Sequence, residues 1–287
     1  MDAKQLEDWL KQTSQSSTPF ILKKPLIMGI VNITTDSFSD GSSFLSVEKA
    51  CEHAYSLIQH GADIIDIGGE STKPGAVRVP LDLELERVIP VIHELRKHSN
   101  TCISIDTYKP EVMKAATEAG ANLINDVYAL RQNNALATVA QLSVPVCLMH
   151  MQGCPQSMQD NPYYEKPVME EIVQFFNERI QACVDAGIAR NRLILDPGFG
   201  FGKQVSHNMG LLHHIEKLQQ FALPILLGAS RKSTLGILLN KKVNERLIGG
   251  IAIAVFAALK GVSMLRTHDV DETAQALKII DAITQAA

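Results

Sequence analysis

The chain has 287 residues, of which 46% are hydrophobic, so it has enough apolar material for a substantial core. Its 27 Lys and Arg and 31 Asp and Glu give a formal net charge of −4 at pH 7. No long basic block is present, which argues against nucleic-acid binding and requires any anion site to be built locally.

Short apolar runs alternate with stretches of helical periodicity along the chain. The runs predict eight strands, over residues 26–31, 63–67, 102–105, 122–124, 146–149, 193–195, 224–227 and 263–265. The stretches predict helices over residues 3–12, 47–59, 83–97, 110–119, 134–142, 167–186, 206–219, 233–239, 245–260 and 269–283. Repeated units of this kind predict an α/β fold, a (β/α)8 TIM barrel forming one domain over residues 25–287, with an N-terminal extension over residues 1–24.

Targeting signals are not evident in the sequence. Five cysteines form no CxxC pair and are odd in number, which favours reduced thiols in a cytoplasmic protein. The N-terminus lacks the apolar stretch of a secretory signal. The longest apolar tract, residues 247–259, is short and contains glycine, so no membrane span is expected.

Two polar loops follow the first two predicted strands. Residues 32–41 include one exposed aromatic candidate, Phe38, and suit either a mobile lid or an ordinary surface loop. The amide oxygen of Asn32 suits Mg²⁺, although Asn32 can equally cap a turn. Residues 68–76 bring adjacent glycines, the Thr72 hydroxyl and the Lys73 charge, and suit either close approach to a ligand or a plain turn.

Polar residues also end several later strands, and a parallel barrel gathers these ends at one mouth. Asp106, Asn125 and Asp196 together offer acceptors and an amide donor to a flat heterocycle that carries N–H groups. They can instead cap helices, serve acid–base catalysis or bind a metal. Met149, next to His150, suits packing against either a flat ligand or the core.

The segment 196–203 alternates glycines with Phe199 and Phe201. Each ring can stack on an aromatic substrate or fold back onto the core. The spacing lacks the GxGxxG form, and Gln204 stands where an ATP-binding loop has Ser or Thr, so ATP and NAD binding are rejected.

The last two strand ends predict an anion site. Residues 230–233 open a short helix after the seventh strand, in the quadrant where barrels often bind phosphate. Arg266 offers a planar fork of donors, and His268 can add another. In the alternative interpretation, Arg231 and Arg266 merely pair with carboxylates at the rim.

Taken in order, these segments resemble the successive motifs of the dihydropteroate synthase family. They are residues 32–41, 68–76, 104–107, 125–126, 149–151, 196–203, 230–233 and 266–270. The resemblance covers most of the chain from about residue 25 onward. It implies a homodimeric barrel that uses Mg²⁺ to join 7,8-dihydropterin-6-ylmethyl diphosphate to 4-aminobenzoate in folate synthesis, with release of diphosphate.

The resemblance also implies roles for individual residues. The pterin would be held by Asp106, Asn125, Asp196 and Lys232, with Met149 as a further substrate contact; the diphosphate would lie near Thr72, Lys73, Arg266 and His268; the aminobenzoate site would be shaped by Phe38, Pro74, Phe201 and Ser233. Asn32 would bind Mg²⁺, and the implied catalytic residues are Asp106, Lys232, Arg266 and His268. Thr35 and Lys73 depart from the family's proline and arginine, which loosens one loop and replaces a fork of donors by a point charge.

The implied reaction is a dissociative, SN1-like displacement. Mg²⁺, Arg266 and His268 would stabilise the departing diphosphate. An Asp106 carboxylate with a reference pKa of about 3.9 would be ionised near neutrality and would favour positive charge on the pterin. Closure of the first two loops would exclude water, and the neutral aromatic amine would need no general base.

Two other classes of protein fit parts of this pattern. A methyltransferase that binds methyltetrahydrofolate on a related barrel would keep Asp106, Asn125 and Asp196. It would not need Lys232 or the anion-binding pair Arg266 and His268. A catalytically silent pterin-binding or scaffold protein would be expected to lose the charged rim residues, all of which are present here. Release of diphosphate from both substrates with Mg²⁺ discriminates among the three.

Overall fold

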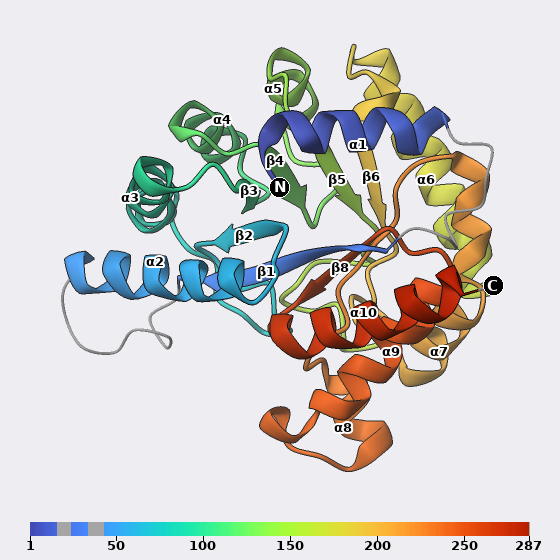
Figure 1. Cartoon of the computed structure of the whole chain (residues 1–287). Helices are drawn as coiled ribbons and strands as arrows, with labels where there is room; N and C mark the ends of the chain where they lie inside the picture. Colours follow the sequence, from blue (N-terminus) through green and yellow to red (C-terminus); the bar gives the residue numbers. More distant parts are fainter. Residues whose placement is uncertain (16–23, 34–42, 287) are drawn as a thin grey trace.

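A computed structural model describes residues 1–15, 24–33 and 43–286 of the chain. Within that part, parallel strands pair in the order β6-β5-β4-β3-β2-β1-β8-β7. The strands are β1 (Leu26–Asn32), β2 (Ile64–Gly68), β3 (Cys102–Asp106), β4 (Leu123–Asp126), β5 (Val146–Met149), β6 (Leu193–Asp196), β7 (Leu226–Leu227) and β8 (Met264–Thr267). A parallel bridge between Leu195 and Ile225 links β6 to the start of β7, so the predicted eight-stranded barrel is confirmed (Figure 1).

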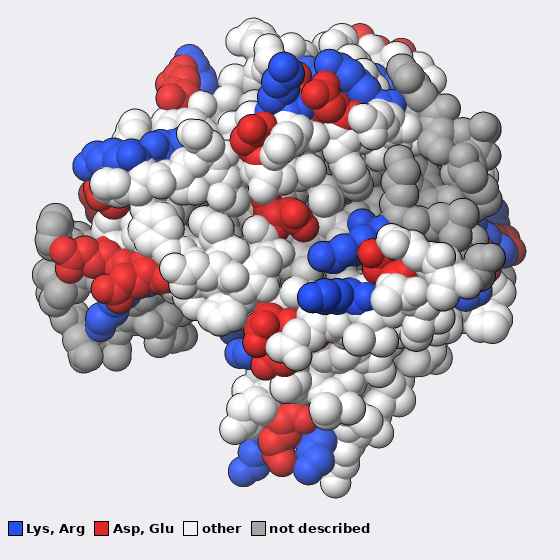
Figure 2. Space-filling model, in the orientation of Figure 1, with Lys and Arg blue, Asp and Glu red and all other residues white. Residues whose placement is uncertain are grey.

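Helices alternate with the strands and surround them (Figure 1). They are α1 (Ala3–Gln15), α2 (Ser43–Gln59), α3 (Leu81–His98), α4 (Pro110–Ala119), α5 (Ala135–Gln141), α6 (Val168–Asp185), α7 (Val205–His213), α8 (Ser233–Leu239), α9 (Leu247–Leu259) and α10 (Val270–Gln285), with 3₁₀ turns η3 (Arg190–Arg192), η4 (Ile215–Phe221) and η5 (Val243–Glu245). None of the described helices is both long and apolar enough to cross a bilayer. On the face in Figure 2, basic and acidic side chains are interspersed rather than gathered in one basic surface.

Several strands run past their predicted ends by one or two residues. Asn32, Asp106 and Asp196, which were expected at strand ends, are the last residues of their strands, and Asp126 ends β4 one residue after Asn125. An apolar run stops at the first polar side chain, whereas the backbone ladder continues to the barrel mouth. The polar side chains at the mouth are therefore oriented by strand geometry.

Two predicted elements are shorter than expected. The helix predicted over residues 206–219 divides at His214, where φ is −113°, into α7 and the 3₁₀ turn η4. The strand predicted over residues 224–227 retains only its last two residues as β7. Pro224 has no N–H for the ladder, although its carbonyl still accepts from the backbone N–H of Leu195 over 2.9 Å.

The barrel interior is apolar at one end and polar at the other. Its apolar end is filled by Leu26, Met28, Ile64, Cys102, Leu123, Cys147, Ile194, Leu226 and Met264. Helix α1 closes this end with Leu6 and Leu10, which are 1% and 3% exposed. The N-terminal helix, for which the sequence predicted no role, thus completes the core, and the opposite end is left for polar side chains.

Candidate active site

The predicted strand-end residues share one layer of the barrel. Alternate residues of a strand point to the same face, so every second residue points inward. Gly68 lies opposite Asp106, and Asp106 lies opposite Asn125 in the neighbouring strand. Farther round the barrel, Met149 lies opposite Asp196. The structure therefore brings these separate segments to a common mouth.

Arg266 lies among the carboxylates of this layer. Its Nε donates to Asp66 Oδ2 over 2.6 Å, and its Nη2 donates to Asp106 Oδ2 over 2.8 Å. Asn125 Nδ2 also donates to Asp66 Oδ2, over 3.3 Å. The structure thus agrees with the alternative interpretation, in which Arg266 pairs with carboxylates. The implied contact between Arg266 and diphosphate stays a prediction.

Two acceptor oxygens in this layer suit a heterocycle. Oδ1 of Asp66 and Oδ1 of Asp106 are buried and have no hydrogen-bond partner within the described part of the chain. Buried acceptors without a donor are unfavourable, so these oxygens are poised to receive N–H groups from a ligand.

The protonation of Asp106 differs from the expectation. Burial raises the pKa of Asp106 to about 7, even though Arg266 acts to lower it. The expectation of an ordinary carboxyl pKa at this position is therefore wrong. The barrel wall removes the water that would stabilise the charge, and this loss outweighs the attraction of the guanidinium group.

Lys232 and Phe201 line another part of the mouth. Lys232 Nζ donates to the carbonyl of Phe199 and lies 4.2 Å from the ring centroid of Phe201. Burial lowers the pKa of Lys232 to about 7, against the opposing charge of Asp196. Phe199 is fully buried and Phe201 only partly, so Phe201 is the ring left to face a substrate.

Glycine allows Lys232 to lie against this loop. Gly200 has a φ of +81°, and a Cβ there would come within 2.9 Å of the Lys232 side chain. A side chain at this position would therefore displace the lysine as well as strain the backbone.

Met149 belongs to an apolar cluster beside the polar layer. It is 3% exposed, and it packs with Tyr108, Tyr128 and Met151 in a cluster against which Phe201 rests. Met149 is thus mainly core, and it supports the ring of Phe201 at the mouth.

The β2–α3 loop carries the predicted contacts Thr72, Lys73 and Pro74. Lys73 and Pro74 are exposed, while Thr72 is half-buried. The loop is tied to the segment after β5, because the backbone N–H of Gly75 donates to the carbonyl of Pro155 over 3.2 Å. Lys73 lies near enough to His268 to oppose its protonation.

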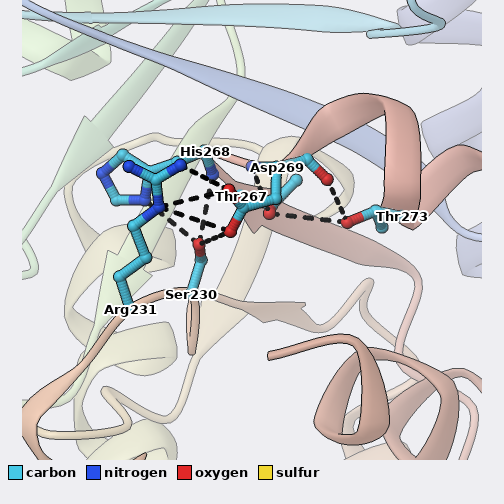
Figure 3. A network of polar contacts seen from close by, with 6 residues as sticks. All are labelled: Ser230, Arg231, Thr267, His268, Asp269 and Thr273. Carbon is cyan, nitrogen blue, oxygen red and sulfur yellow. Dashed lines mark hydrogen bonds and ion pairs between the residues drawn. The ribbon is translucent and has the colours of Figure 1, made fainter. Parts of the chain in front are cut away.

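The loops after β7 and β8 meet in a polar network (Figure 3). Arg231 and Asp269 form an ion pair, so the alternative interpretation is also correct for Arg231. His268 Nδ1 lies 3.1 Å from Ser230 Oγ. Burial, together with the nearby charges of Arg266 and Arg231, lowers the pKa of His268 to about 3, so the ring is neutral at pH 7. Ser233, a predicted contact, begins α8 two residues after Arg231.

Asn32, the predicted Mg²⁺ ligand, lies opposite Gly68 in the neighbouring strand. A Cβ on Gly68 would lie 3.5 Å from Asn32 Oδ1 and 3.7 Å from Asp106 Oδ2, so two oxygens flank the glycine. Amide and carboxylate oxygens suit Mg²⁺. Among the described residues no group of three or more His, Cys, Asp or Glu side chains could hold a metal, so further ligands would have to come from substrate and water.

Some predicted features lie outside the described residues. These are Phe38, Thr35 and the rest of the first loop from residue 34 to residue 42.

The sequence interpretation missed Asp66 as a site residue. Asp66 is fully buried and accepts from both Arg266 and Asn125. A charged residue at the centre of the apolar run 64–68 was a signal that could have revealed it, because buried carboxylates are seldom unpaired.

The sequence predicted no role of its own for Lys203, the last residue of the segment 196–203 in which ATP and NAD binding were rejected. Its Nζ donates to the carbonyls of Gly198 and Phe201 over 2.9 and 3.1 Å, and it lies 2.9 Å from His150 Nδ1. Lys203 thus fixes the loop that presents Phe201 and joins it to the end of β5.

A second buried network supports the β2–α3 loop. Lys109 forms ion pairs with Glu70 and Glu84, both of which are buried. Tyr108 Oη donates to Glu70 over 2.9 Å, and Thr107 Oγ1 donates to Glu84 over 2.6 Å. This network ties the β2–α3 loop to the residues that directly follow Asp106.

Comparisons with known proteins agree with this geometry. The chain matches the pterin binding enzyme family over residues 28–268. It is 48% identical over 269 residues to the dihydropteroate synthase of Escherichia coli strain K12, covering 94% of this chain and 95% of the relative. It is 47% identical over 265 residues to that of Haemophilus influenzae, covering 92% and 96%.

Solved structures of relatives share the fold. The Yersinia pestis dihydropteroate synthase with a sulfonamide drug complex has a TM-score of 0.87 and 48% identity, covering 93% of this chain and 96% of that one. The Xanthomonas albilineans enzyme in complex with 7,8-dihydropteroate has a TM-score of 0.82 and 44% identity, covering 93% and 95%. The chain belongs to the pterin-binding enzyme family and, within it, to the dihydropteroate synthases, which are transferases.

Proposed function

We propose that this chain condenses 7,8-dihydropterin-6-ylmethyl diphosphate with 4-aminobenzoate to form 7,8-dihydropteroate and diphosphate in folate synthesis. The observation that carries the proposal is the pair of buried, unpartnered oxygens on Asp66 and Asp106, held beside the Arg266 guanidinium. Acceptors for N–H groups and a fixed cation are thereby placed in one barrel mouth. Relatives solved with 4-aminobenzoate and with 7,8-dihydropteroate support the substrate assignment.

The pterin would bind in the polar layer. Asp66, Asp106 and Asp196 would accept from its N–H groups, while Asn125 and Lys232 would donate to its acceptor atoms. The partly exposed ring of Phe201 would cover one edge of the aminobenzoate site, together with Pro74, Ser233 and Phe38.

The diphosphate would lie across the loops that carry Thr72, Lys73, Arg266 and His268. Mg²⁺, held by Asn32 and substrate oxygens, would supply positive charge to the leaving group. Arg266 offers the fixed guanidinium, and Lys73 adds an exposed, adjustable charge.

The reaction would be a dissociative displacement. The C–O bond to diphosphate would break first, with positive charge spread over the pterin methylene and ring. The amine nitrogen would then form the new C–N bond and release one proton to the departed diphosphate or to water. Ionised Asp106 would stabilise the positive charge, while Arg266 would stabilise the departing anion. Because the amine attacks after the bond has broken, its nucleophilicity should have little influence on the rate of C–O cleavage.

The activity is tested by supplying both substrates with Mg²⁺ and measuring released diphosphate and dihydropteroate. An Asp106→Ala variant should lose turnover more than substrate binding, and an unchanged turnover number would contradict the role of Asp106. The dissociative order is tested by single-turnover cleavage with a series of substituted anilines. A cleavage rate that rises steeply with amine basicity would contradict it.

Two further features support the proposal that the chain forms a homodimer and lies in the cytoplasm. Large apolar side chains are exposed on the α8–α10 side: Ile237, Leu238, Leu239, Val243, Ile248, Phe256, Leu259, Ile279 and Ile283. A surface of this kind is typical of a subunit interface. All five cysteines are free thiols, as a reducing compartment favours. Sedimentation analysis at micromolar concentration tests the dimer.

A further inference from the structure

The hydroxyl oxygen of Ser230 is the centre of the network between the loops after β7 and β8 (Figure 3). Ser230 Oγ lies 3.2 Å from Asp269 Oδ2, 3.1 Å from His268 Nδ1 and 3.3 Å from the backbone nitrogen of His268. A serine hydroxyl donates one hydrogen and accepts up to two. The three contacts therefore use its whole capacity, and the single hydrogen can go to only one of them.

The chemistry of the neighbours decides where that hydrogen points. Asp269 forms an ion pair with Arg231, and a carboxylate in such a pair can only accept. The backbone N–H of His268 can only donate. If Ser230 donated to His268 Nδ1, Oγ and Asp269 Oδ2 would be two acceptors 3.2 Å apart with no hydrogen between them. The favourable arrangement has Ser230 donating to Asp269 and His268 Nδ1–H donating to Ser230.

We propose that Ser230, oriented by Asp269, is a positioning residue that holds neutral His268 in its Nδ1–H tautomer, which leaves Nε2 as a hydrogen-bond acceptor. The hydrogen bond made by one ring nitrogen sets the protonation of the other. His268 then differs from Arg266, which is a permanent donor. His268 can form a hydrogen bond with an anion only when a proton lies between Nε2 and a phosphate oxygen.

The environment of His268 determines when Nε2 becomes protonated. Burial opposes protonation most, and the charges of Arg266 at the end of β8, Arg231 from the loop after β7 and Lys73 from the β2–α3 loop oppose it too. Asp269 favours protonation. A bound diphosphate offsets these positive charges. The proton comes from water or from a hydrogen diphosphate ion, and only O–H and N–H bonds change. The choice of diphosphate rests on the proposed function, whereas the tautomer does not.

The tautomer is read directly from the ¹⁵N shifts of the histidine rings in the full-length, ¹⁵N-labelled protein without ligands. The chain has nine histidines, and a His268→Gln variant identifies the signals of His268 by their loss. We expect Nδ1 to carry the hydrogen in the unaltered protein. Nε2–H in the unaltered protein would overturn the inference without bearing on the proposed activity.

An Asp269→Asn variant should invert the tautomer. The carboxylate oxygen nearest Arg231 is Oδ1, while Oδ2 faces Ser230. An amide with its oxygen toward Arg231 would place an NH₂ group toward Ser230, so the hydroxyl would turn and donate to His268 Nδ1. A population still mainly Nδ1–H in this variant would also overturn the inference. If this variant does not fold, Ser230→Ala replaces it and should abolish the Nδ1–H preference.

Ser56 and His60 provide a matched control. Ser56 Oγ lies 3.4 Å from His60 Nδ1 on the surface, but that nitrogen also lies 2.7 Å from the Ser56 carbonyl, which can only accept, so Ser56→Ala should leave the tautomers of both His60 and His268 unaltered. Addition of inorganic diphosphate should move His268, but not His60, toward the shifts of a protonated ring. A His268 ring that stays neutral with diphosphate bound would contradict the proton-mediated contact.

Discussion

Arg266 Nη2 donates to Asp106 Oδ2 over 2.8 Å, although 160 positions separate the two residues along the chain. Burial acts to lower the pKa of Arg266, but the charges of Asp66 and Asp106 reverse this effect and raise the pKa above its ordinary value. One permanent cation therefore serves two carboxylates inside the barrel. The same contacts hold strands together and prepare the mouth for a ligand.

Replacing Arg266 by methionine should destabilise the fold. Two buried carboxylates would lose their partner, and breaking a buried pair costs about 3–5 kcal/mol of the free energy of unfolding. Urea unfolding at pH 8 measures the loss. Adding Asp66→Asn and Asp106→Asn to this variant should recover part of it, because the unpaired charges are removed. A single variant as stable as the unaltered protein would contradict the assignment.

The pH profile of kcat/KM should be bell-shaped with its maximum near pH 7. Activity rises with pH as Asp106, whose pKa is about 7, loses its proton and can stabilise positive charge. Activity falls at higher pH as Lys232, whose pKa is also about 7, loses the charge that binds the pterin. Lys232→Arg should remove the alkaline limb, since arginine stays protonated. Persistence of that limb would rule out Lys232 as its source.

The two phenylalanines of the β6–α7 loop should behave differently. Phe199→Ala should lower the free energy of unfolding by about 3–5 kcal/mol, because Phe199 is fully buried. Phe201→Ala should raise KM for 4-aminobenzoate with a smaller loss of stability, because its ring is partly exposed beside Lys232. Steady-state kinetics and thermal unfolding of both variants separate the effects. Equal losses of stability would contradict this division of roles.

Lys109 should be a positioning residue for the β2–α3 loop. Lys109→Met leaves the buried carboxylates of Glu70 and Glu84 without their cation, so it should destabilise the chain by about 3–5 kcal/mol. It should also raise KM for the diphosphate substrate and speed proteolysis within residues 69–79. The exposed pair of Lys97 and Glu94 supplies the control, because Lys97→Met should leave the stability nearly unchanged.

Helix α1 should contribute to stability and not to catalysis. Leu6→Ala removes a side chain that is 1% exposed at the closed end of the barrel, and should cost about 2–5 kcal/mol. Leu83→Ala, at a side chain that is 39% exposed, should change stability by about 0.5 kcal/mol or less. Turnover numbers at low temperature should be equal for both. A selective loss of turnover in Leu6→Ala would assign α1 a catalytic role.

Much of the fold was predictable because the signals are local. Apolar runs and helical periodicity predict the strand–helix units, and the barrel follows from their number. The inward direction of Asp106 and Asn125 then follows from strand alternation. The partners of Arg266 were not predictable in the same way, because they depend on how β8 is staggered against β2 and β3, which lie two and three strands away in the barrel.

Burial within loops was less predictable than burial within strands. Phe199 and Phe201 have the same neighbours in sequence, yet only Phe199 is fully buried. The left-handed backbone of Gly198 and Gly200 sets their directions, and this conformation is not encoded in a hydrophobic pattern. The ordinary pKa expected for Asp106 also failed for a non-local reason, because desolvation depends on every element around the site.

The closure of the barrel between β6 and β7 is its weakest seam. It has a bridge between Leu195 and Ile225, and β7 itself is two residues long. Amide hydrogens along this seam should therefore exchange with solvent earlier than those of β1 and β2. Asp196 and Lys232 lie in the segments on either side of this seam. A transient opening between β6 and β7 would therefore change the distance between Asp196 and Lys232 while leaving the hydrogen bond between Arg266 and Asp106 intact.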